Sequence, residues 1–431
     1  MTEWTLAAVA GTVLAFGAFS RRLERSVVSA AIFFVSAGLV LGSDGLGWID
    51  LGINSHQIRV LAEVALTLVL FADASRINLR AMQKEYTVPA RLLGIGLPLT
   101  ILAGWGLATA VLGDLSWSEA LVLAVILAPT DAALGEAVVT DSRLPSRIRQ
   151  SLNVESGLND GICVPLLFIA LASASAEDGS LSVGHAATIV VEEIGYGVVG
   201  GVVAGAVGAA IVRLLVPLGW SAPAWIQVVP VGCAALAYGV AAPLGGSGFI
   251  AAFVAGLVFG GLDAGTDGEG TYLLDELGGL ASAVTFLVFG ASIVGPVLSG
   301  LTWAAAAYAV LSLSVIRMLP VAIALAGTHA RPPTVAYLGW FGPRGLASIV
   351  FIVLTVEGSS LPHANTMVLA VVATIVISVY AHGLSAHPLT AHYARWYAAH
   401  PDQDLPRMES VPAGHQRWRR PTAVPVSSGR H

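Results

Sequence analysis

Four carboxylates lie within an otherwise apolar stretch of this chain, at Asp131, Glu136, Glu155 and Asp160. An ionised carboxylate at bilayer depth costs about 3 kcal/mol on insertion scales, so such residues usually mark an ion or proton path. Four of them within thirty residues require a reason. The chemistry that they could support is the reversible binding of a cation or a proton.

Pro129 precedes the first of these carboxylates and interrupts the apolar run 117–140. Its ring removes a backbone N–H, crowds a carbonyl one turn earlier and disfavours helical geometry at Ala128. We therefore expect two half-helices joined by an unwound link near Thr130, which membrane proteins tolerate only beside a cavity or within buried protein. Asp131 would begin the second half-helix, where the positive helix end favours a carboxylate. The alternative is a packing kink with a capping aspartate.

A second polar set lies on the next predicted helix, over residues 149–173. Glu155 and Asn159 are four residues apart. Ser156 and Asp160 repeat that spacing, so the four side chains lie on adjacent stripes of one helix face. Two carboxylates, a hydroxyl and an amide oxygen are hard ligands that suit a small hard cation. The alternative is a polar seam that only joins two helices, and the neighbouring Thr-Asp pair favours the cation site over it.

Composition places the chain in a membrane. It has 431 residues, of which 56% are hydrophobic and 11% charged, with a mean hydropathy of +0.79. A soluble protein would carry roughly a quarter charged residues. Apolar runs of bilayer-spanning length recur along nearly the whole chain. The sequence predicts an all-α polytopic membrane protein, and nothing in it suggests a nucleic-acid partner.

We predict thirteen transmembrane helices in a transporter domain at 1–386, followed by a short cytoplasmic, disordered tail at 387–431. The N-terminus has no basic region before its apolar run, so the first segment is predicted to be a span and not a cleaved signal. The predicted spans are about 4–20, 27–42, 57–75, 88–113, 117–140, 149–173, 184–213, 222–242, 247–262, 273–298, 302–327, 334–357 and 364–386.

Basic residues concentrate in alternate connections between these spans. The first, third and fifth loops and the tail carry most of the arginines, whereas loops of the opposite parity carry aspartates and glutamates. The positive-inside rule then places the N-terminus outside and the C-terminus in the cytoplasm of a multi-pass protein of the cell membrane.

The other reactive residues show no motif for a cofactor or a structural metal, while Glu192 or Glu193 could lie near an interface or in a second polar site. Cys163 and Cys233 lie in separate apolar spans, and the ten histidines show no ligand spacing, so neither a metal-site motif nor a cofactor is predicted. Arg317 lies inside the eleventh span and must pair with a residue that the sequence does not identify. Glu192 and Glu193 lie at membrane depth without an evident partner.

The twelfth predicted span contains a second break, at the Gly-Pro-Arg-Gly run 342–345. Pro343 again interrupts an apolar run, and a charged residue follows at once. Two crossing broken helices bring positive and negative helix ends together, and Asp131 and Arg344 can neutralise them. Paired interrupted segments in corresponding halves indicate a transporter site at the interface of inverted repeats.

These motifs resemble those of the cation:proton antiporter superfamily. The resemblance lies in the Thr-Asp pair 130–131, the run 155–160 and the Pro-Arg-Gly run 343–345. The pair Asn159-Asp160 is similar to that of electroneutral, NhaP-type sodium/proton exchangers, whereas electrogenic relatives typically carry two aspartates. The resemblance implies a thirteen-span fold with core and dimerisation subdomains, a homodimer and elevator-like alternating access.

The resemblance also implies which residues contact the transported ion. Asp160 would be the carboxylate that Na⁺ and H⁺ share. Glu155, Ser156 and the backbone carbonyl of Thr130 would be further contacts of the ion.

Three other residues would organise the crossing of the broken helices. The resemblance gives this role to Asn159 and Asp131. Arg344 would balance the charge of the crossing and pair with Glu155.

Two positions depart from the family pattern. Many relatives have proline directly after the aspartate of the broken helix, where this chain has Ala132. Relatives commonly carry a larger residue where this chain has Gly157. Both changes could alter the local geometry and the choice of ion without removing the carboxylate.

Charge cost alone supports an exchange mechanism. An ionised Asp160 in a poorly hydrated site is costly, and either protonation or cation binding neutralises it. If the protein switches sides only when neutralised, then H⁺ competes with Na⁺ or Li⁺, or with K⁺ as the nearest alternative. One-to-one exchange would move no net charge. The expected partners are these ions and membrane lipid.

Two other classes of protein remain as alternatives. A proton-coupled transporter of a small organic solute would also use buried carboxylates, but it should need a larger cavity. A membrane-embedded hydrolase could use Ser156 with a carboxylate. We do not expect an enzyme, because no intramembrane His or Lys is placed as a base and there is no nucleophile motif.

Overall fold

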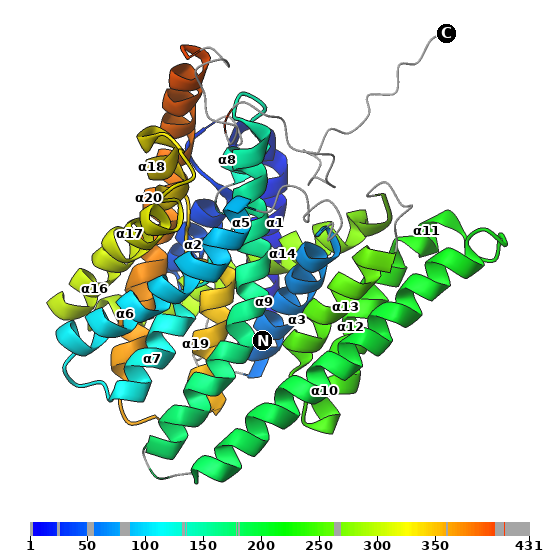
Figure 1. Ribbon diagram of the computed structural model, residues 1–431, viewed down its shortest axis with the longest axis horizontal. Coiled ribbons are helices and arrows are strands. Elements are labelled where there is room, and N and C mark those ends of the chain that lie inside the picture. The colour runs from blue at the N-terminus through cyan, green and yellow to red at the C-terminus, as the bar shows by residue number, and fades with distance from the viewer. Residues whose placement is uncertain are drawn as a thin grey trace.

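The helices of the chain form one bundle of long, tilted elements (Figure 1). Among the residues that the structure describes there are no strands, and eight helices are long and apolar enough to cross a membrane. The prediction of an all-α polytopic protein is therefore confirmed. The structure is a computed structural model, and it describes residues 3–23, 26–49, 56–77, 87–131, 134, 136–177, 179, 182–262, 269–358, 361–400 and 409.

Each of the thirteen predicted spans coincides with one helix, with consecutive helices or with two half-helices, while the number of membrane crossings remains a prediction. The helices are α1 (Glu3–Leu23), α2 (Ala30–Leu41), α3 (His56–Ser75), α5 (Thr87–Arg91), η1 (Leu92–Gly96), α6 (Leu97–Val111), α7 (Trp117–Ile126), α8 (Glu136–Thr140), α9 (Ser146–Glu177), α10 (Val183–Ala210), η3 (Ile211–Leu215), α11 (Pro223–Ile226), α12 (Val228–Ala241), η4 (Ala242–Leu244), α13 (Gly248–Leu262), η5 (Glu269–Thr271), α14 (Tyr272–Phe289), η6 (Gly290–Val294), α15 (Gly295–Leu298), α16 (Trp303–Leu313), α17 (Val315–Ala324), α18 (Pro332–Trp340), α19 (Leu346–Gly358) and α20 (Ala364–Ala398).

The helices pack in two groups. In one group α3, α10, α12, α13 and α14 pack chiefly against one another, and in the other α6, α7, α9, α16 and α20 do so. The two groups meet where α9 packs against α10, α3 and α13. Figure 1 shows α10, α12 and α13 on one side of the bundle and α6, α7 and α16 on the other. Helix α9 therefore lies between the two groups, and it carries the polar run identified in the sequence.

Both predicted breaks are present. Helix α7 ends at Ile126, three residues before Pro129, and α18 ends at Trp340, three residues before Pro343. The two links lie side by side, because the backbone N–H of Asp131 donates to the carbonyl of Pro343 at 2.8 Å. Four half-helices, α7, α8, α18 and α19, therefore end or begin around one crossing point.

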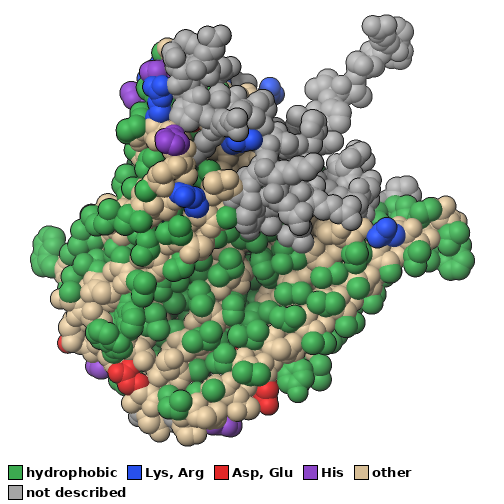
Figure 2. Space-filling model, in the orientation of Figure 1, with side chains coloured by type: hydrophobic (Ala, Val, Ile, Leu, Met, Phe, Trp, Pro, Cys, Tyr) green, Lys and Arg blue, Asp and Glu red, His purple; other side chains and the backbone are tan. Residues whose placement is uncertain are grey.

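Charged side chains lie mainly at the two ends of the bundle. Figure 2 shows a broad belt of hydrophobic side chains, with Lys and Arg at one end and Asp and Glu at the opposite end. This asymmetry agrees with the alternation of basic and acidic loops in the sequence. Loop residues 24–25, 50–55 and 78–86, which carry part of that alternation, lie outside the described residues, and the orientation remains a prediction.

The predicted start of the tail at residue 387 is wrong for residues 387–398, because α20 continues to Ala398. Pro388 lies inside this helix, and the apolar and aromatic residues beyond it still pack. Tyr393 is 3% exposed, and its ring centroid lies 4.6 Å from that of Tyr337. Burial of such rings offsets the hydrogen bond that the proline removes. Residues 401–408 and 410–431 lie outside the described residues, so the prediction of disorder stays open there.

Candidate functional site

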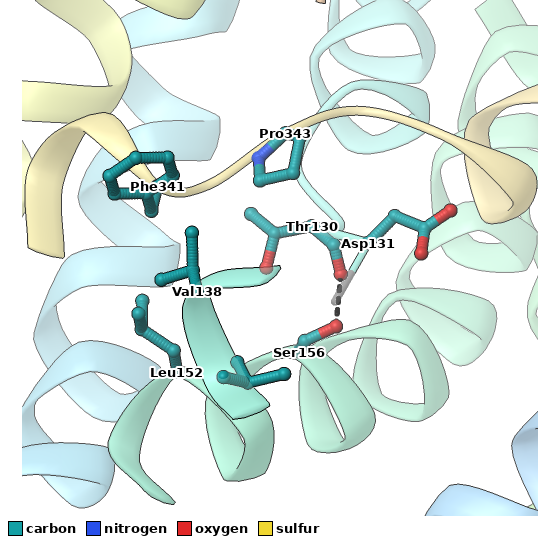
Figure 3. Close-up of a pocket in the computed structure, with 8 residues that line it drawn as sticks. Thr130, Asp131, Val138, Leu152, Ser156, Phe341 and Pro343 are labelled. Carbon is teal, nitrogen blue, oxygen red and sulfur yellow. Dashed lines mark hydrogen bonds between the residues drawn. The ribbon is translucent and has the colours of Figure 1, made fainter. Parts of the chain in front are cut away.

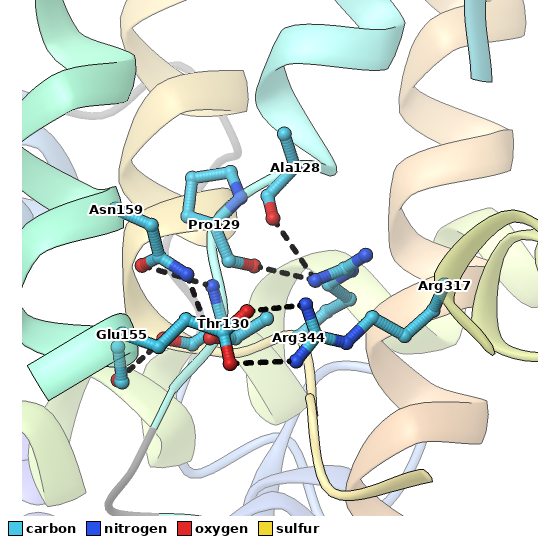
Figure 4. A network of polar contacts seen from close by, with 8 residues as sticks. Ala128, Pro129, Thr130, Glu155, Asn159, Arg317 and Arg344 are labelled. Atoms are coloured by element: carbon cyan, nitrogen blue, oxygen red, sulfur yellow. Dashed lines mark hydrogen bonds and ion pairs between the residues drawn. The ribbon is translucent and has the colours of Figure 1, made fainter. Parts of the chain in front are cut away.

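Arg344 lies at the centre of the crossing and is completely buried. Its Nη1 donates to the carbonyl oxygens of Ala128 at 3.0 Å and Pro129 at 3.1 Å (Figure 4). These carbonyls follow the last turn of α7, where the helix leaves acceptors unpaired and carries a partial negative charge. The guanidinium of the second link therefore stabilises the end of a helix that belongs to the first break.

Asp131 makes the reciprocal contact. Its Oδ2 accepts a hydrogen bond from the backbone N–H of Leu346 at 3.0 Å. Leu346 is the first residue of α19, so the carboxylate lies at the positive end of that half-helix. Gly345 makes this approach possible, since a Cβ there would collide with the carboxylate of Asp131.

The sequence predicts Asp131 at the start of the second half-helix of its own span, whereas its described carboxylate contact is to α19 of the other break. Helix α8 begins five residues later, at Glu136. The side chain of Glu136 lies outside the described residues. The physical reason is the crossing itself. The hydrogen bond to Pro343 holds the first link beside the second and directs the Asp131 carboxylate to α19.

Helix α9 holds the first link through Thr130. The hydroxyl of Ser156 donates to the carbonyl oxygen of Thr130 at 2.6 Å (Figure 3). Asn159 binds the same residue twice, with Nδ2 donating to Oγ1 at 2.7 Å and Oδ1 accepting from the backbone N–H at 3.3 Å. All three residues are buried. An irregular backbone segment at membrane depth is thus supplied with the partners that it needs.

Asp160 lies one residue beyond Asn159 and is 6% exposed. Within the described part of the chain, no hydrogen-bond partner reaches its buried Oδ1. Three charged groups act on it electrostatically, namely the carboxylates of Asp131 and Asp73 and the guanidinium of Arg344. A buried polar atom without a partner costs about 1–3 kcal/mol, and more if it is charged. A proton or a cation on this carboxylate would remove that cost.

Glu155 is bound on both oxygens by Arg317. The two ion-pair distances are 2.5 and 2.9 Å, and each side chain is 4% exposed (Figure 4). The expected pairing of Glu155 with Arg344 is therefore wrong. Arg344 is directed to the carbonyls of α7, while the planar fork of Arg317 matches a carboxylate in bidentate geometry. The same contact supplies the partner of the intramembrane arginine, which the sequence left unidentified.

Asp73, on α3, is a carboxylate near the site that the sequence reasoning missed. A Cβ at Gly157 would lie 3.0 Å from the Cβ of Asp73, so the glycine lets α3 pack closely against α9 beside Asp160. Asp73 pairs with Arg76 at 3.1 Å, and Arg76 also pairs with Asp275 on α14. The sequence carried one signal of this packing, because Gly157 departs from the family pattern. It did not identify Asp73 as the residue that packs against the glycine.

A small pocket lies beside the first link (Figure 3). Its empty volume is about 250 Å³ with space open to solvent included, so the enclosed space is well below the range of about 300–1,000 Å³ typical of sites for organic ligands. It is lined by Thr130, Asp131, Val138, Leu152, Ser156 and Phe341. Thr130 and Ser156 therefore lie beside space that is open to solvent.

The family model "Sodium/hydrogen exchanger, transmembrane" matches residues 8–392. The chain belongs to the sodium/hydrogen exchanger family. This is a family of transporters, and the match confirms the resemblance that the motifs around Asp131, Asp160 and Arg344 had indicated.

Individual relatives of this chain are antiporters by name. The chain is 27% identical over 389 residues to the "K(+)/H(+) antiporter NhaP" of Alkalimonas amylolytica, covering 87% of this chain and 64% of that protein. It is 32% identical over 145 residues to the "Na(+)/H(+) antiporter" of Saccharomyces cerevisiae, covering 31% of this chain and 14% of that one. The chain thus spans less than two thirds of the length of either relative.

The structure of this chain is similar to that of the sodium proton antiporter MjNhaP1 from Methanocaldococcus jannaschii, determined at pH 8. The TM-score is 0.68 at 19% sequence identity, covering 88% of this chain and 98% of that one. At this identity the similarity establishes the fold, and the predicted antiporter fold is confirmed.

Proposed function

We propose that this protein is a secondary active antiporter that exchanges a monovalent cation for H⁺ by alternating access. The observation that carries the proposal is the buried Oδ1 of Asp160, which receives no hydrogen bond from any described residue and lies beside two crossing broken helices. Family membership and the antiporter names of two relatives support it.

Asp160 is the carboxylate on which cation and proton compete. Ser156 and the carbonyl of Thr130 offer neutral oxygen ligands on the same side of α9, and their mutual hydrogen bond of 2.6 Å keeps them adjacent. Glu155 adds negative charge next to them, although Arg317 holds both of its oxygens. We therefore assign the exchangeable charge to Asp160. Glu155 is a further contact of the cation, and the strength of that contact depends on Arg317.

The organising residues compensate the charges of the helix ends at the crossing, which leaves the charge of Asp160 to be neutralised by the ion or the proton. Arg344 compensates the negative end of α7, and Asp131 compensates the positive end of α19. Asn159 fixes the backbone of Thr130. When Asp160 is ionised and empty, the site carries an unbalanced charge that is costly to move through an apolar environment. Binding either H⁺ or a monovalent cation removes it, so exchange is one-to-one and electroneutral.

We also propose an oligomeric state and an orientation in the membrane for this protein. It is a homodimer in the cell membrane with the N-terminus outside and the C-terminus in the cytoplasm, and the transporter domain includes α20 up to Ala398. The basic and acidic ends seen in Figure 2 support this orientation. Residues 401–431 form a cytoplasmic extension. Dimerisation is proposed from family resemblance.

Proteoliposomes that enclose a pH-sensitive dye test the function. Na⁺, Li⁺ or K⁺ is added outside under an imposed pH gradient, with and without a clamp of the membrane potential by valinomycin and K⁺. We expect cation-evoked proton movement that the clamp does not alter, and loss of that movement in Asp160→Asn. Asp114→Asn, in an exposed turn, is the matched control.

Two results would contradict the proposal. The first is an Asp160→Asn protein that exchanges normally. The second is wild-type protein that responds to no cation but moves protons with an organic solute, which would favour the alternative transporter class. The small volume of the pocket at Thr130 argues against that class.

A further inference from the structure

Helix α20 forms hydrogen bonds with the second break through residues on one of its faces. Ser378, His382 and Ser385 are spaced by four and three residues, so their side chains lie on one side of the helix. The hydroxyl oxygen of Ser378 accepts the backbone N–H of Arg344 at 2.7 Å. The indole N–H of Trp340 donates to the hydroxyl oxygen of Ser385 at 2.9 Å. His382 lies between these two contacts.

The imidazole of His382 reaches the end of α18. Its Nε2 lies 2.9 Å from the carbonyl oxygen of Trp340, the last residue of that half-helix. A carbonyl can only accept, so Nε2 carries the proton of this hydrogen bond. The ring is 1% exposed and is stacked on the indole of Trp340, with centroids 4.9 Å apart and an interplanar angle of 27°. The donor is therefore held in place by packing as well as by its partner.

This contact completes a pattern at the crossing. The negative end of α7 receives Arg344, and the positive end of α19 receives Asp131. The carbonyl of Trp340 belongs to the negative end of α18, and it receives Nε2–H from His382. A third helix end at the crossing is thus stabilised, and by a residue from outside both breaks.

The other ring nitrogen links this cap to Arg344. The Nδ1 of His382 lies 3.2 Å from the hydroxyl oxygen and 2.9 Å from the carbonyl oxygen of Ser378. The carbonyl of Ser378 can accept from a protonated Nδ1, and the hydroxyl of Ser378, whose oxygen already accepts the N–H of Arg344, can donate to an unprotonated one. Ser378 therefore offers Nδ1 a partner in either protonation state. The charged groups within range are the guanidinium groups of Arg344 and Arg317, which would repel a positive ring.

We propose that His382 is a positioning residue of the antiport site. Its ring fixes the end of α18 through Trp340 and contacts Ser378, which holds the backbone of Arg344. Arg344 can then reach the carbonyls of α7, and Pro343 can hold the link that carries Asp131. The inference rests on the proposed function, because its readout is cation-dependent exchange.

Three variants separate positioning from mere packing. His382→Gln keeps an N–H donor near the position of Nε2 but does not titrate. His382→Phe keeps a ring that can stack on Trp340 but cannot donate. His392→Gln changes an exposed histidine of the same helix and serves as the matched control.

Exchange is measured in proteoliposomes with Na⁺, Li⁺ and K⁺ as probes, per amount of protein that elutes as a single folded species. His382→Phe is expected to raise the apparent KM for the cation about tenfold, because a buried carbonyl loses its donor. His382→Gln and His392→Gln should keep the wild-type KM and the wild-type pH profile. A residue that only supports the fold would lower yield or melting temperature and leave KM unchanged.

A wild-type KM in His382→Phe, or a shifted pH profile in His382→Gln, would overturn the inference. If His382→Phe does not fold, Ser378→Ala takes its place, because it removes the hydroxyl between the ring and Arg344, and the same rise in KM is expected. Absence of exchange in the wild-type protein is a different outcome, since it would refute the proposed function itself.

Discussion

Replacing Arg317 by Met should destabilise the protein strongly, although the two side chains have nearly the same volume. The guanidinium lies 2.5 and 2.9 Å from the two oxygens of Glu155, and each side chain is 4% exposed. Removing one partner of such a buried pair leaves an uncompensated charge and costs about 3–5 kcal/mol. Replacing both partners leaves no buried charge. The double variant Glu155→Gln with Arg317→Met should therefore be more stable than Arg317→Met alone.

Thermal unfolding of the purified protein measures these differences. We expect the melting temperature of Arg317→Met to fall by about 6–10 °C, taking about 2 °C for each kcal/mol in a chain of this size. The double variant should recover more than half of that loss. Arg59→Met is the matched control, since Arg59 pairs with Glu63 at 2.7 Å but is 42% exposed. It should cost about 1 kcal/mol or less.

Two results would refute this reasoning. If Arg317→Met melts no lower than Arg59→Met, the bidentate pair does not stabilise the fold. If the double variant is no more stable than Arg317→Met, the loss does not come from an unpaired Glu155.

The other predictions concern the crossing and the loop after α8. Gly345→Ala should abolish exchange, because the added Cβ would collide with the carboxylate of Asp131, whereas Gly358→Ala, where the Cβ meets nothing within 4 Å, should exchange normally. Transport assays on both variants check this. Outside the spans, hydrogen bonds from Arg143 lower the pKa of Asp141. Its contribution to stability is therefore present above the unfolded pKa of about 3.9 and is lost as the pH falls through the folded value. Melting temperatures of Arg143→Gln and wild type should differ at pH 7 and converge in acid, and a constant difference would contradict the assignment.

Local chemistry made the two breaks predictable. Pro129 and Pro343 each interrupt an apolar run, and the loss of a backbone donor acts within one turn of helix. The structure ends α7 and α18 three residues before these prolines. The side chain of Asn159 forms hydrogen bonds with Thr130 in the first link. It lies on the face of α9 that the four-residue spacing from Glu155 predicts. These features depend on neighbours in the sequence.

Contacts between distant segments were not predictable in the same way. Glu155 and Arg317 are 162 residues apart, and only the fold decides that Arg317, and not Arg344, reaches the carboxylate. Asp131 was predicted to lie at the start of the second half-helix of its own span, but its carboxylate accepts a hydrogen bond from the first residue of α19. Asp73 was missed because its place depends on the close packing that Gly157 permits between α3 and α9.

The pH dependence of cation affinity tests most directly whether one carboxylate binds cation and proton in turn. In proteoliposomes, the apparent KM for the transported cation is measured at a series of pH values for the wild-type protein. Competition at Asp160 predicts that KM rises by about tenfold for each unit of falling pH below the pKa of the site, while the maximal rate at saturating cation stays constant. An apparent KM that does not change with pH, or a maximal rate that falls with pH while KM stays constant, would contradict a shared carboxylate.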